Sequence, residues 1–190
     1  MSVLSDTALI SWEFTNELLP NLRDTDKTRY ERLINAASKT ACRITKRELK
    51  AQDYTSILDG NGRDVLLLPE YPVNSVTSLY IDISRTFGDD TEETNYLYYE
   101  DTGKLVLPYS YFPQYPQCVK VLYNAGFDPI PEDLELAVLE VVLYNAKRLS
   151  GDAGTVGIRS IAGADGLNTA YELTIPVNAQ RVFESYRRDE

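Results

Sequence analysis

The stretch of residues 118–149 constrains the fold most, because it joins a strand directly to the most apolar helix of the chain. Residues 119–123 place apolar side chains at alternate positions and include two valines, which is typical of a buried strand. A turn sequence follows, and Pro131 then suits the first position of a helix, where its missing N–H has no cost. Acidic residues begin that helix, and Lys147 and Arg148 end it, so its charges match the helix dipole. We therefore predict a central helix that ends near residue 149.

The middle of this predicted helix is apolar on nearly every side. Between Leu136 and Leu143 the only charged residue is Glu140, and a helix of that kind is covered over most of its surface. The cover comes either from its own subunit alone or also from a neighbouring subunit. We predict a subunit contact that includes Leu136, Leu139, Glu140 and Leu143.

A second predicted helix, at about residues 26–49, carries the largest charge asymmetry of the chain. Apolar residues recur on one face at spacings of three and four, and basic residues occupy the opposite face. Residues 27–50 contain eight Lys and Arg against two Glu, whereas the whole chain has a formal charge of −10. This basic face is either simply solvated or meets an acidic surface, on a neighbouring copy of the chain or on DNA. For the neighbouring copy, the predicted contacts are Arg32, Lys39, Arg43 and Arg47.

Between these two helices the periodicity becomes alternating, which indicates a β lobe at residues 52–123. The predicted elements are a hairpin of strands 54–58 and 65–68, a strand at 73–83, and a hairpin of strands 96–99 and 105–107. An earlier helix is predicted from Ser5 or Asp6 to Leu19, where Pro20 stops it. The fold class is therefore α+β: a helical body of three main helices and a short C-terminal helix, with a small antiparallel β lobe inserted.

Two motifs of the lobe have both a structural and a functional interpretation. The sequence DGNGRD partly matches a calcium-binding loop, but it lacks the downstream glutamate and the flanking helices, so a turn is favoured. Tyr109, Tyr111, Phe112 and Tyr115 lie between prolines and have the rings needed to stack on sugars or bases. Prolines between aromatic residues more often mark a packed, irregular loop, and we favour that interpretation.

After the central helix the chain becomes rich in glycine. Five of the ten glycines fall within residues 151–166, which predicts a flexible segment at 151–170. A short strand at 171–174 and a helix starting at Pro176 follow, and that helix is too short to be stable alone in water. The predicted organisation is helices at 1–51, the β lobe at 52–123, the central helix at 124–150, the flexible segment at 151–170 and a docking strand and helix at 171–190.

The residue types needed for catalysis are scarce. The chain has no histidine, no phosphate-binding glycine loop and no cysteine spacing typical of zinc, so we predict no cofactor, no metal and no enzyme activity. The net charge of −10 argues against a general nucleic-acid binder. No apolar run approaches the ~20 residues of a membrane span, and the N-terminus does not resemble a signal peptide.

Four motifs in order resemble one known family. They are DTDKTRYERLINAASKTACRITKREL, then YTSILDGNGRDVLLLPEYPVNSVTSLYID, then LYNAGFDPIPEDLELAVLEVVLYNAKR, and finally IPVNAQRVFESYRR. Together they span about residues 25–188 and are similar to the phage head–tail connector, or adaptor, proteins of long-tailed phages. Members share the amphipathic helix with a basic end, the β insertion, the long helix after a proline and the closing helix that ends in Tyr-Arg-Arg.

This resemblance implies a structural virion protein without catalysis, located at the capsid vertex and in the host cytoplasm during assembly. Such adaptors form a ring, usually twelve-fold, beneath the portal protein, extend the DNA channel and dock the head-closure or tail-completion protein. DNA passes through without specific binding, and no membrane is involved. The predicted portal-binding residues are Tyr171, Val177, Val182, Phe183, Tyr186, Arg187 and Arg188.

Two other classes of function stay open at the level of sequence. The tyrosine-rich part of the lobe is compatible with a module that binds carbohydrate or another ligand. The many carboxylates are compatible with a hydrolase, although the sequence does not place two of them in one cleft.

Overall fold

The computed structural model describes residues 3–19, 22–149, 158–162, 168–172 and 175–188. The chain divides into two compact units: Met1–Arg47 with Ile130–Glu190 form unit 1, and Glu48–Pro129 form unit 2. Unit 1 is mainly helical and unit 2 contains two three-stranded antiparallel sheets, so the predicted α+β class is confirmed. Unit 2 contains the whole of the predicted β lobe.

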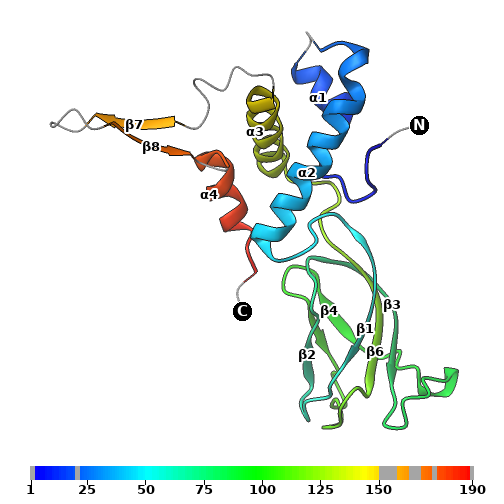
Figure 1. The fold of residues 1–190 in the computed structure, drawn as a ribbon. Coiled ribbons are helices and arrows are strands. Elements are labelled where there is room, and N and C mark those ends of the chain that lie inside the picture. Colours follow the sequence, from blue (N-terminus) through cyan, green and yellow to red (C-terminus); the bar gives the residue numbers. More distant parts are fainter. Residues whose placement is uncertain (1–2, 20–21, 150–157, 163–167, 173–174, 189–190) are drawn as a thin grey trace. The chain divides into compact units, whose positions relative to one another are not determined.

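Three helices form the body of unit 1. They are α2 (Lys27–Thr45), α3 (Glu132–Leu149) and α4 (Val177–Ser185), and each packs on the other two (Figure 1). Ile34, Val138 and Phe183, one from each helix, are fully buried. The apolar stripes read from the sequence thus meet in one core, which stabilises α4, a helix of nine residues that is too short to persist alone.

The N-terminal helix is shorter than predicted. The structure has α1 at Trp12–Leu18, and the Ser11 hydroxyl caps it by accepting the Phe14 N–H at 3.0 Å. The predicted start at Ser5 or Asp6 is wrong, because residues 3–10 run outside helical structure along α2. Trp12 then packs near Tyr30 of α2, with 6.1 Å between ring centroids.

A short 3-10 helix, η1 (Asp24–Asp26), precedes α2, which ends at Thr45 rather than near residue 49. Lys46 closes α2 in the left-handed conformation, with φ of 57°. A residue in that conformation ends a helix, because its Cβ crowds the following carbonyl group. The chain then enters unit 2.

The predicted flexible segment contains two strands. β7 (Ile158–Ala162) pairs antiparallel with β8 (Asn168–Glu172), so regular structure replaces part of that prediction. All five of its glycines lie outside the described residues. β8 also begins three residues before the strand predicted at 171–174, and Tyr171 pairs with Arg159 across the hairpin.

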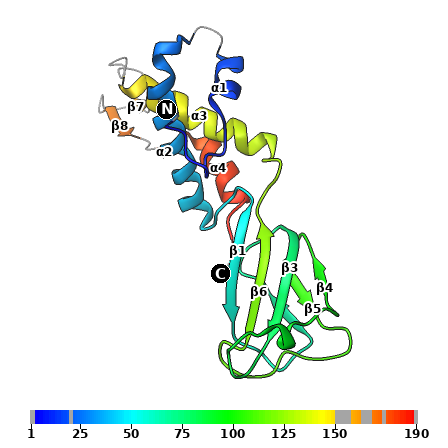
Figure 2. The same ribbon diagram turned by 90° about the vertical axis from the view of Figure 1, so that its right-hand side faces the viewer.

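Unit 2 is built from two sheets. One has the strand order β1–β6–β3, with β1 at Gln52–Leu58, β6 at Val119–Ala125 and β3 at Val73–Ile81 (Figure 2). The other has the order β2–β5–β4, with β2 at Val65–Leu67, β5 at Lys104–Val106 and β4 at Leu97–Tyr99. Buried residues of both sheets, such as Leu105 and Val121, belong to one core. The alternation of β6 therefore reflects one face packed on the core.

The first predicted hairpin is wrong, and the second is confirmed. β4 pairs with β5 as expected, but β1 pairs with β6, and β2 pairs with β5. The loop between β1 and β2 therefore crosses from one sheet to the other. Its turn chemistry is real, because the Asn61 side chain bonds both Val65 O and Arg63 N, at 2.8 and 2.9 Å. A turn signal shows where the chain bends, whereas the buried apolar partners decide which strands pair.

A second helix of the 3-10 type, η2 (Asp89–Thr91), lies in the loop after β3. β3 ends at Ile81 because the next residue, Asp82, folds the chain back. Its carboxylate accepts N–H groups of Ser84, Thr86 and Phe87 at 2.8–2.9 Å, and the hydroxyl groups of Ser84 and Thr86 at 2.6 and 2.7 Å. These donors, led by the Ser84 hydroxyl, hold the pKa of Asp82 well below its usual range. At neutral pH the ionised Asp82 carboxylate therefore holds the start of the acidic loop, residues 86–95, by hydrogen bonds.

Candidate functional site

The outer face of α2 is a continuous basic surface. Arg32, Lys39 and Arg43 are all exposed, and their spacing of seven and four places them on one side of the helix. The opposite side completely buries Ile34, Ala37 and Ala41. Among the described residues, neither Arg32 nor Arg43 makes an ion pair. We call these exposed cations, together with Arg29 near the start of the helix, the basic face.

Arg47 does not belong to the basic face. The helix ends at Thr45, and Arg47 lies in the segment after the left-handed Lys46, with only 9% of its surface exposed. Its charge instead lies near Tyr186 of α4, where it offsets a small part of the rise that burial causes in the pKa of that phenol. The expectation that Arg47 is exposed with the other three cations is therefore wrong, because the sequence pattern assumed a longer helix.

The apolar residues predicted as a contact on α3 divide between core and surface. Leu139 is buried, with 6% exposed, and packs inside unit 1. Leu136 is 54% exposed, and Glu140 and Leu143 are half-buried. Leu136, Glu140 and Leu143 recur at four and three, so they lie on one side of α3. Full burial of α3 within its own subunit is thus excluded, and a leucine side remains open to a partner.

Helix α4 docks on its own unit. Phe183 and Ala179 are fully buried, whereas Val177, Val182 and Tyr186 are half-buried. The Tyr186 hydroxyl donates to Asp133 Oδ1 at 2.8 Å, and the Arg188 N–H donates to Thr45 O at 3.0 Å. From its short length we expected this segment to be mobile or only loosely docked, with packing on its own subunit as the alternative. The structure shows α4 docked on its own subunit. Only Arg187 among the predicted portal-binding residues is exposed, and the side chain of Tyr171 lies outside the described residues.

The hydrogen bond of Tyr186 makes the docking of α4 sensitive to alkaline pH, which weakens it. Burial, and next the bond to Asp133, raises the pKa of Tyr186 to about 12, against about 10 in an unfolded chain. The stability that this phenol contributes is therefore complete below pH ~10 and is lost as the pH rises towards 12. We expect the stability difference between wild type and Tyr186→Phe to shrink between pH 9 and pH 11.5 in urea unfolding. Tyr109→Phe, at an 88% exposed position, should show no such trend, and a constant difference for Tyr186→Phe would contradict this assignment.

The sequence did not reveal that the N-terminal segment is attached to α2. Val3 N donates to Glu31 Oε2 at 2.9 Å, Ser5 N donates to Asn35 Oδ1 at 2.9 Å, and Leu9 N donates to Ser38 Oγ at 3.1 Å.

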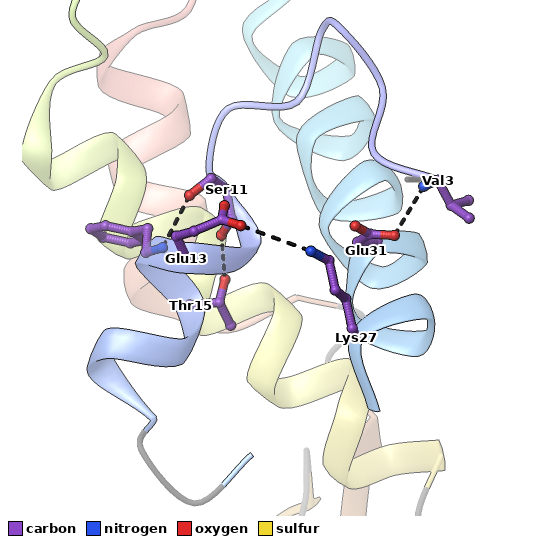
Figure 3. A network of polar contacts seen from close by, with 7 residues as sticks. Val3, Ser11, Glu13, Thr15, Lys27 and Glu31 are labelled. Atoms are coloured by element: carbon purple, nitrogen blue, oxygen red, sulfur yellow. Dashed lines mark hydrogen bonds and ion pairs between the residues drawn. The ribbon is translucent and has the colours of Figure 1, made fainter. Parts of the chain in front are cut away.

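Figure 3 shows the first of these bonds beside the ion pair of Glu13 and Lys27, whose charged atoms are 3.9 Å apart. In the sequence, this attachment is indicated only by the polar residues Glu31, Asn35 and Ser38 on one side of α2, of which Glu31 and Ser38 are buried. These side chains satisfy backbone N–H groups that would otherwise lack partners in a packed position.

Unit 2 presents aromatic side chains on an ordered loop. Phe112 is fully buried, as the packed-loop interpretation expects, but Tyr109, Tyr111 and Tyr115 are 88%, 65% and 52% exposed. Backbone bonds hold this loop to residues 60–63: the N–H groups of Gly60 and Gly62 donate to Tyr115 O and Phe112 O, at 2.9 and 2.8 Å. The packed-loop interpretation is thus correct for Phe112 and wrong for the three tyrosines. Exposed tyrosines on a rigid loop are typical of protein interfaces.

The described residues contain no group of three or more His, Cys, Asp or Glu side chains placed to hold a metal ion. Within the same residues, no helix combines the length and apolar content that a membrane span requires. The carboxylates of the acidic loop lie on the surface of unit 2, with Asp89, Asp90 and Glu92 exposed. The geometry therefore offers three surfaces for assembly: the basic face, the leucine side of α3 and the loop of residues 109–115, which we call the tyrosine loop.

Solved structures share this fold. A chain from the neck of the native GTA particle, computed with C12 symmetry, is 20% identical and superposes with a TM-score of 0.61. A chain from the neck of the empty GTA particle, computed with C6 symmetry, is 19% identical, with a TM-score of 0.63. A chain from the virion of the native gene transfer agent (GTA) particle is 20% identical, with a TM-score of 0.61. Each alignment covers 100% of the present chain and 94% of the other chain.

No curated protein matches the sequence significantly. The sequence model of one family, described as head completion protein, matches residues 8–189. That match includes every described helix and strand of both units, so it does not rest on one motif or one domain. It agrees with the resemblance to head–tail connector proteins that the four sequence motifs indicated. The chain belongs to the head completion protein family.

Proposed function

We propose that this chain is a structural head–tail protein whose copies form a ring beneath the portal at the capsid vertex. The observation that carries the proposal is the family match over residues 8–189. The fold shared with chains of particle necks computed with C12 and C6 symmetry supports a ring, since both symmetries are compatible with twelve copies. No step of this role requires catalysis.

The charge of the chain suits the wall of a DNA channel. Unit 2 contains 13 Asp and Glu against five Lys and Arg, and the whole chain has a formal charge of −10. An acidic wall repels the phosphate backbone, so DNA passes without being held. The basic face on α2 is the exception, and we assign it to contact with an adjacent copy of the chain.

Contacts with the two neighbours in the virion are assigned to different units. For the portal protein we propose the surface around α4, where Arg187 is exposed and Val182 is half-buried. For the head-closure or tail-completion protein we propose the tyrosine loop of unit 2, because rigid exposed tyrosines lose little entropy on binding. The leucine side of α3 is proposed as a further subunit contact.

Native mass spectrometry of the chain, alone and with portal particles, tests the ring. Wild-type protein is expected to associate with the portal as a ring of about twelve copies. Reversing two cations of the basic face, with Arg32→Glu and Arg43→Glu, is expected to abolish assembly. Each exposed ion pair contributes only ~0–1 kcal/mol, but a ring repeats the loss at every interface, and salt should weaken the wild-type ring as well.

Arg63→Glu with Arg85→Glu is the matched control, because it makes the same charge change at exposed positions of unit 2. This control should assemble normally. The assignment of the basic face is wrong if the Arg32 and Arg43 double variant assembles like wild type from about 50 to 500 mM salt. The ring itself is wrong if wild-type protein stays monomeric in the presence of portal particles.

A further inference from the structure

Unit 1 has a surface hollow at the N-terminal end of the basic face. Its volume is about 420 Å³, and it is lined by Thr25, Thr28, Arg29, Arg32, Leu33 and Leu149. These residues come from η1, from the start of α2 and from the last position of α3. The hollow therefore combines two guanidinium groups, two hydroxyl groups and two leucines.

The position of Arg29 is set by its contact with α3. Its Nη2 donates to Ala146 O at 3.3 Å, which satisfies a carbonyl group in the last turn of α3. A guanidinium has five N–H donors, so this contact leaves most of them for a ligand. Arg32, one turn further along α2, makes no hydrogen bond or ion pair within the described part of the chain. Two cations thus line one hollow while only one donor is used internally.

Two further features favour an anion in this hollow. Thr28 and Arg29 lie in the first turn of α2, and no side chain caps that turn by a hydrogen bond. The Lys27 N–H donates to Asp24 O of η1, and the first turn of this 19-residue helix carries the partial positive charge of the helix dipole. The nearby carboxylate of Asp26 already lies 3.6 Å from Arg23 Nε and accepts the Arg23 N–H at 3.4 Å. Asp26 therefore neutralises Arg23, which lies outside the hollow. The positive charges of Arg29 and Arg32, which line the hollow, are left for a ligand.

The leucines distinguish a protein ligand from DNA. Leu149 is 68% exposed and Leu33 is 8% exposed, so one wall of the hollow is apolar. A phosphate backbone offers nothing apolar to such a wall, and the net charge of −10 repels DNA. A carboxylate next to an apolar side chain fits both parts of the hollow.

The chain itself contains a segment with this chemistry. In unit 2, Phe87 is partly exposed and is followed by the exposed carboxylates of Asp89, Asp90 and Glu92. The hydrogen bonds to Asp82 hold the start of this loop, so the acidic residues project from a fixed base. Unit 2 carries a surplus of eight acidic residues, whereas the hollow is basic.

We propose that the hollow is a receptor for the acidic loop, residues 86–95, of a second copy of this chain. The carboxylates of the loop bind Arg29, Arg32 and the threonine hydroxyl groups, and its apolar side chain packs on the leucines. This inference rests on the proposed ring and names the surfaces that adjacent copies use. It also explains why the basic face and the acidic loop occur in different units of one chain.

The test uses full-length protein whose own loop carries Asp89→Asn, Asp90→Asn, Glu92→Gln and Glu93→Gln. These changes remove the acidic ligand from every copy of the protein, so the hollow is available to the peptide whether or not the copies assemble. The probe is the synthetic peptide TFGDDTEETN, which is residues 86–95, and its control is the amide version TFGNNTQQTN. Binding is followed by NMR shifts of the Thr28 amide and the Arg29 and Arg32 side chains.

The acidic peptide is expected to shift these signals, and the amide peptide is expected to leave them unchanged. Arg32→Glu in the host should weaken binding about ten-fold or more, because it removes a charge-assisted contact and adds repulsion. Arg181→Glu makes the same charge change at an exposed position of unit 1 outside both the hollow and the basic face, so it should weaken binding far less.

Three results would overturn the receptor: equal behaviour of the two peptides, equal losses for Arg32→Glu and Arg181→Glu, or occupation of the hollow by a short DNA duplex in preference to the peptide. The test separates this inference from the proposed function. If rings form on the portal while the acidic peptide leaves the hollow signals unchanged, the receptor is wrong and the ring stands. If the peptide binds the hollow but no ring forms, the proposed function fails instead.

Discussion

Phe183→Ala is expected to destabilise unit 1 by about 3–5 kcal/mol, which is the usual cost of removing a buried phenylalanine side chain. Phe183 is fully buried on α4, a helix of only nine residues, and it lies in the contact of α4 with α2 and α3. A loss of that size is comparable to the total stability of many small domains. The single tryptophan of the chain, Trp12, is buried in unit 1, so its fluorescence in urea unfolding reports this unit.

Arg181→Ala is the control, because Arg181 is exposed on the same helix and should change stability by less than about 0.5 kcal/mol. A Phe183→Ala protein as stable as wild type would show that α4 does not dock in solution. In that case α4 would be a mobile segment in solution, available to become ordered on the portal. With the expected result, any portal contact has to use the outer side of α4, where Arg187 is exposed.

Gly60→Ala should destabilise unit 2 by about 3 kcal/mol or more, at the upper end of what overpacking costs. A Cβ at Gly60 would lie 1.7 Å from Pro113 O and 2.9 Å from Cys118 Sγ. Pro113 belongs to the tyrosine loop and its carbonyl is backbone, so it does not move without breaking the bonds that hold that loop. We therefore expect faster hydrogen exchange at the Phe112 and Gly62 amides, together with a lower thermal midpoint.

Gly88→Ala is the matched control within unit 2. The atom nearest to its Cβ would be Asp90 Oδ1 at 2.7 Å, the end of a flexible and exposed side chain, and the φ of Gly88 is −73°. This variant should unfold within about 0.5 kcal/mol of wild type. The assigned role of Gly60 is wrong if both variants lower the thermal midpoint equally. If Gly60→Ala also weakens binding of the tail-side partner, the rigid tyrosine loop is the docking surface that we propose.

Much of the fold followed from periodicity and turn chemistry. The spacing of Ile34, Ala37 and Ala41 predicted α2 and its buried side, and Pro131 with its acidic followers predicted the start of α3. The alternation at Val119 and Val121 predicted a buried strand. These features are local, since each depends on which side chains a helix or strand places on the same face. The α+β class followed from their order along the chain.

The errors concern partners rather than elements. The sequence placed β1 beside β2, yet each pairs with a strand far along the chain, because burying Leu66 and Leu105 together decides the pairing. Nothing local to Ser5 shows that Asn35 of α2 accepts its N–H at 2.9 Å. A capping residue and a residue that binds another helix look alike until the chain is folded, because the same hydrogen-bonding groups serve both roles.

The candidate surfaces show the same division. The sequence by itself determined that α2 carries an excess of cations, that α3 is apolar and that the inserted lobe has a net negative charge. Only the tertiary structure decided that Arg47, Leu139 and Phe183 are covered, and that Arg32 lines a hollow with Leu149. Composition and spacing specify the face of an element, whereas exposure depends on which other element covers that face. That cover is set by contacts between residues more than a hundred positions apart, such as Arg29 with Ala146.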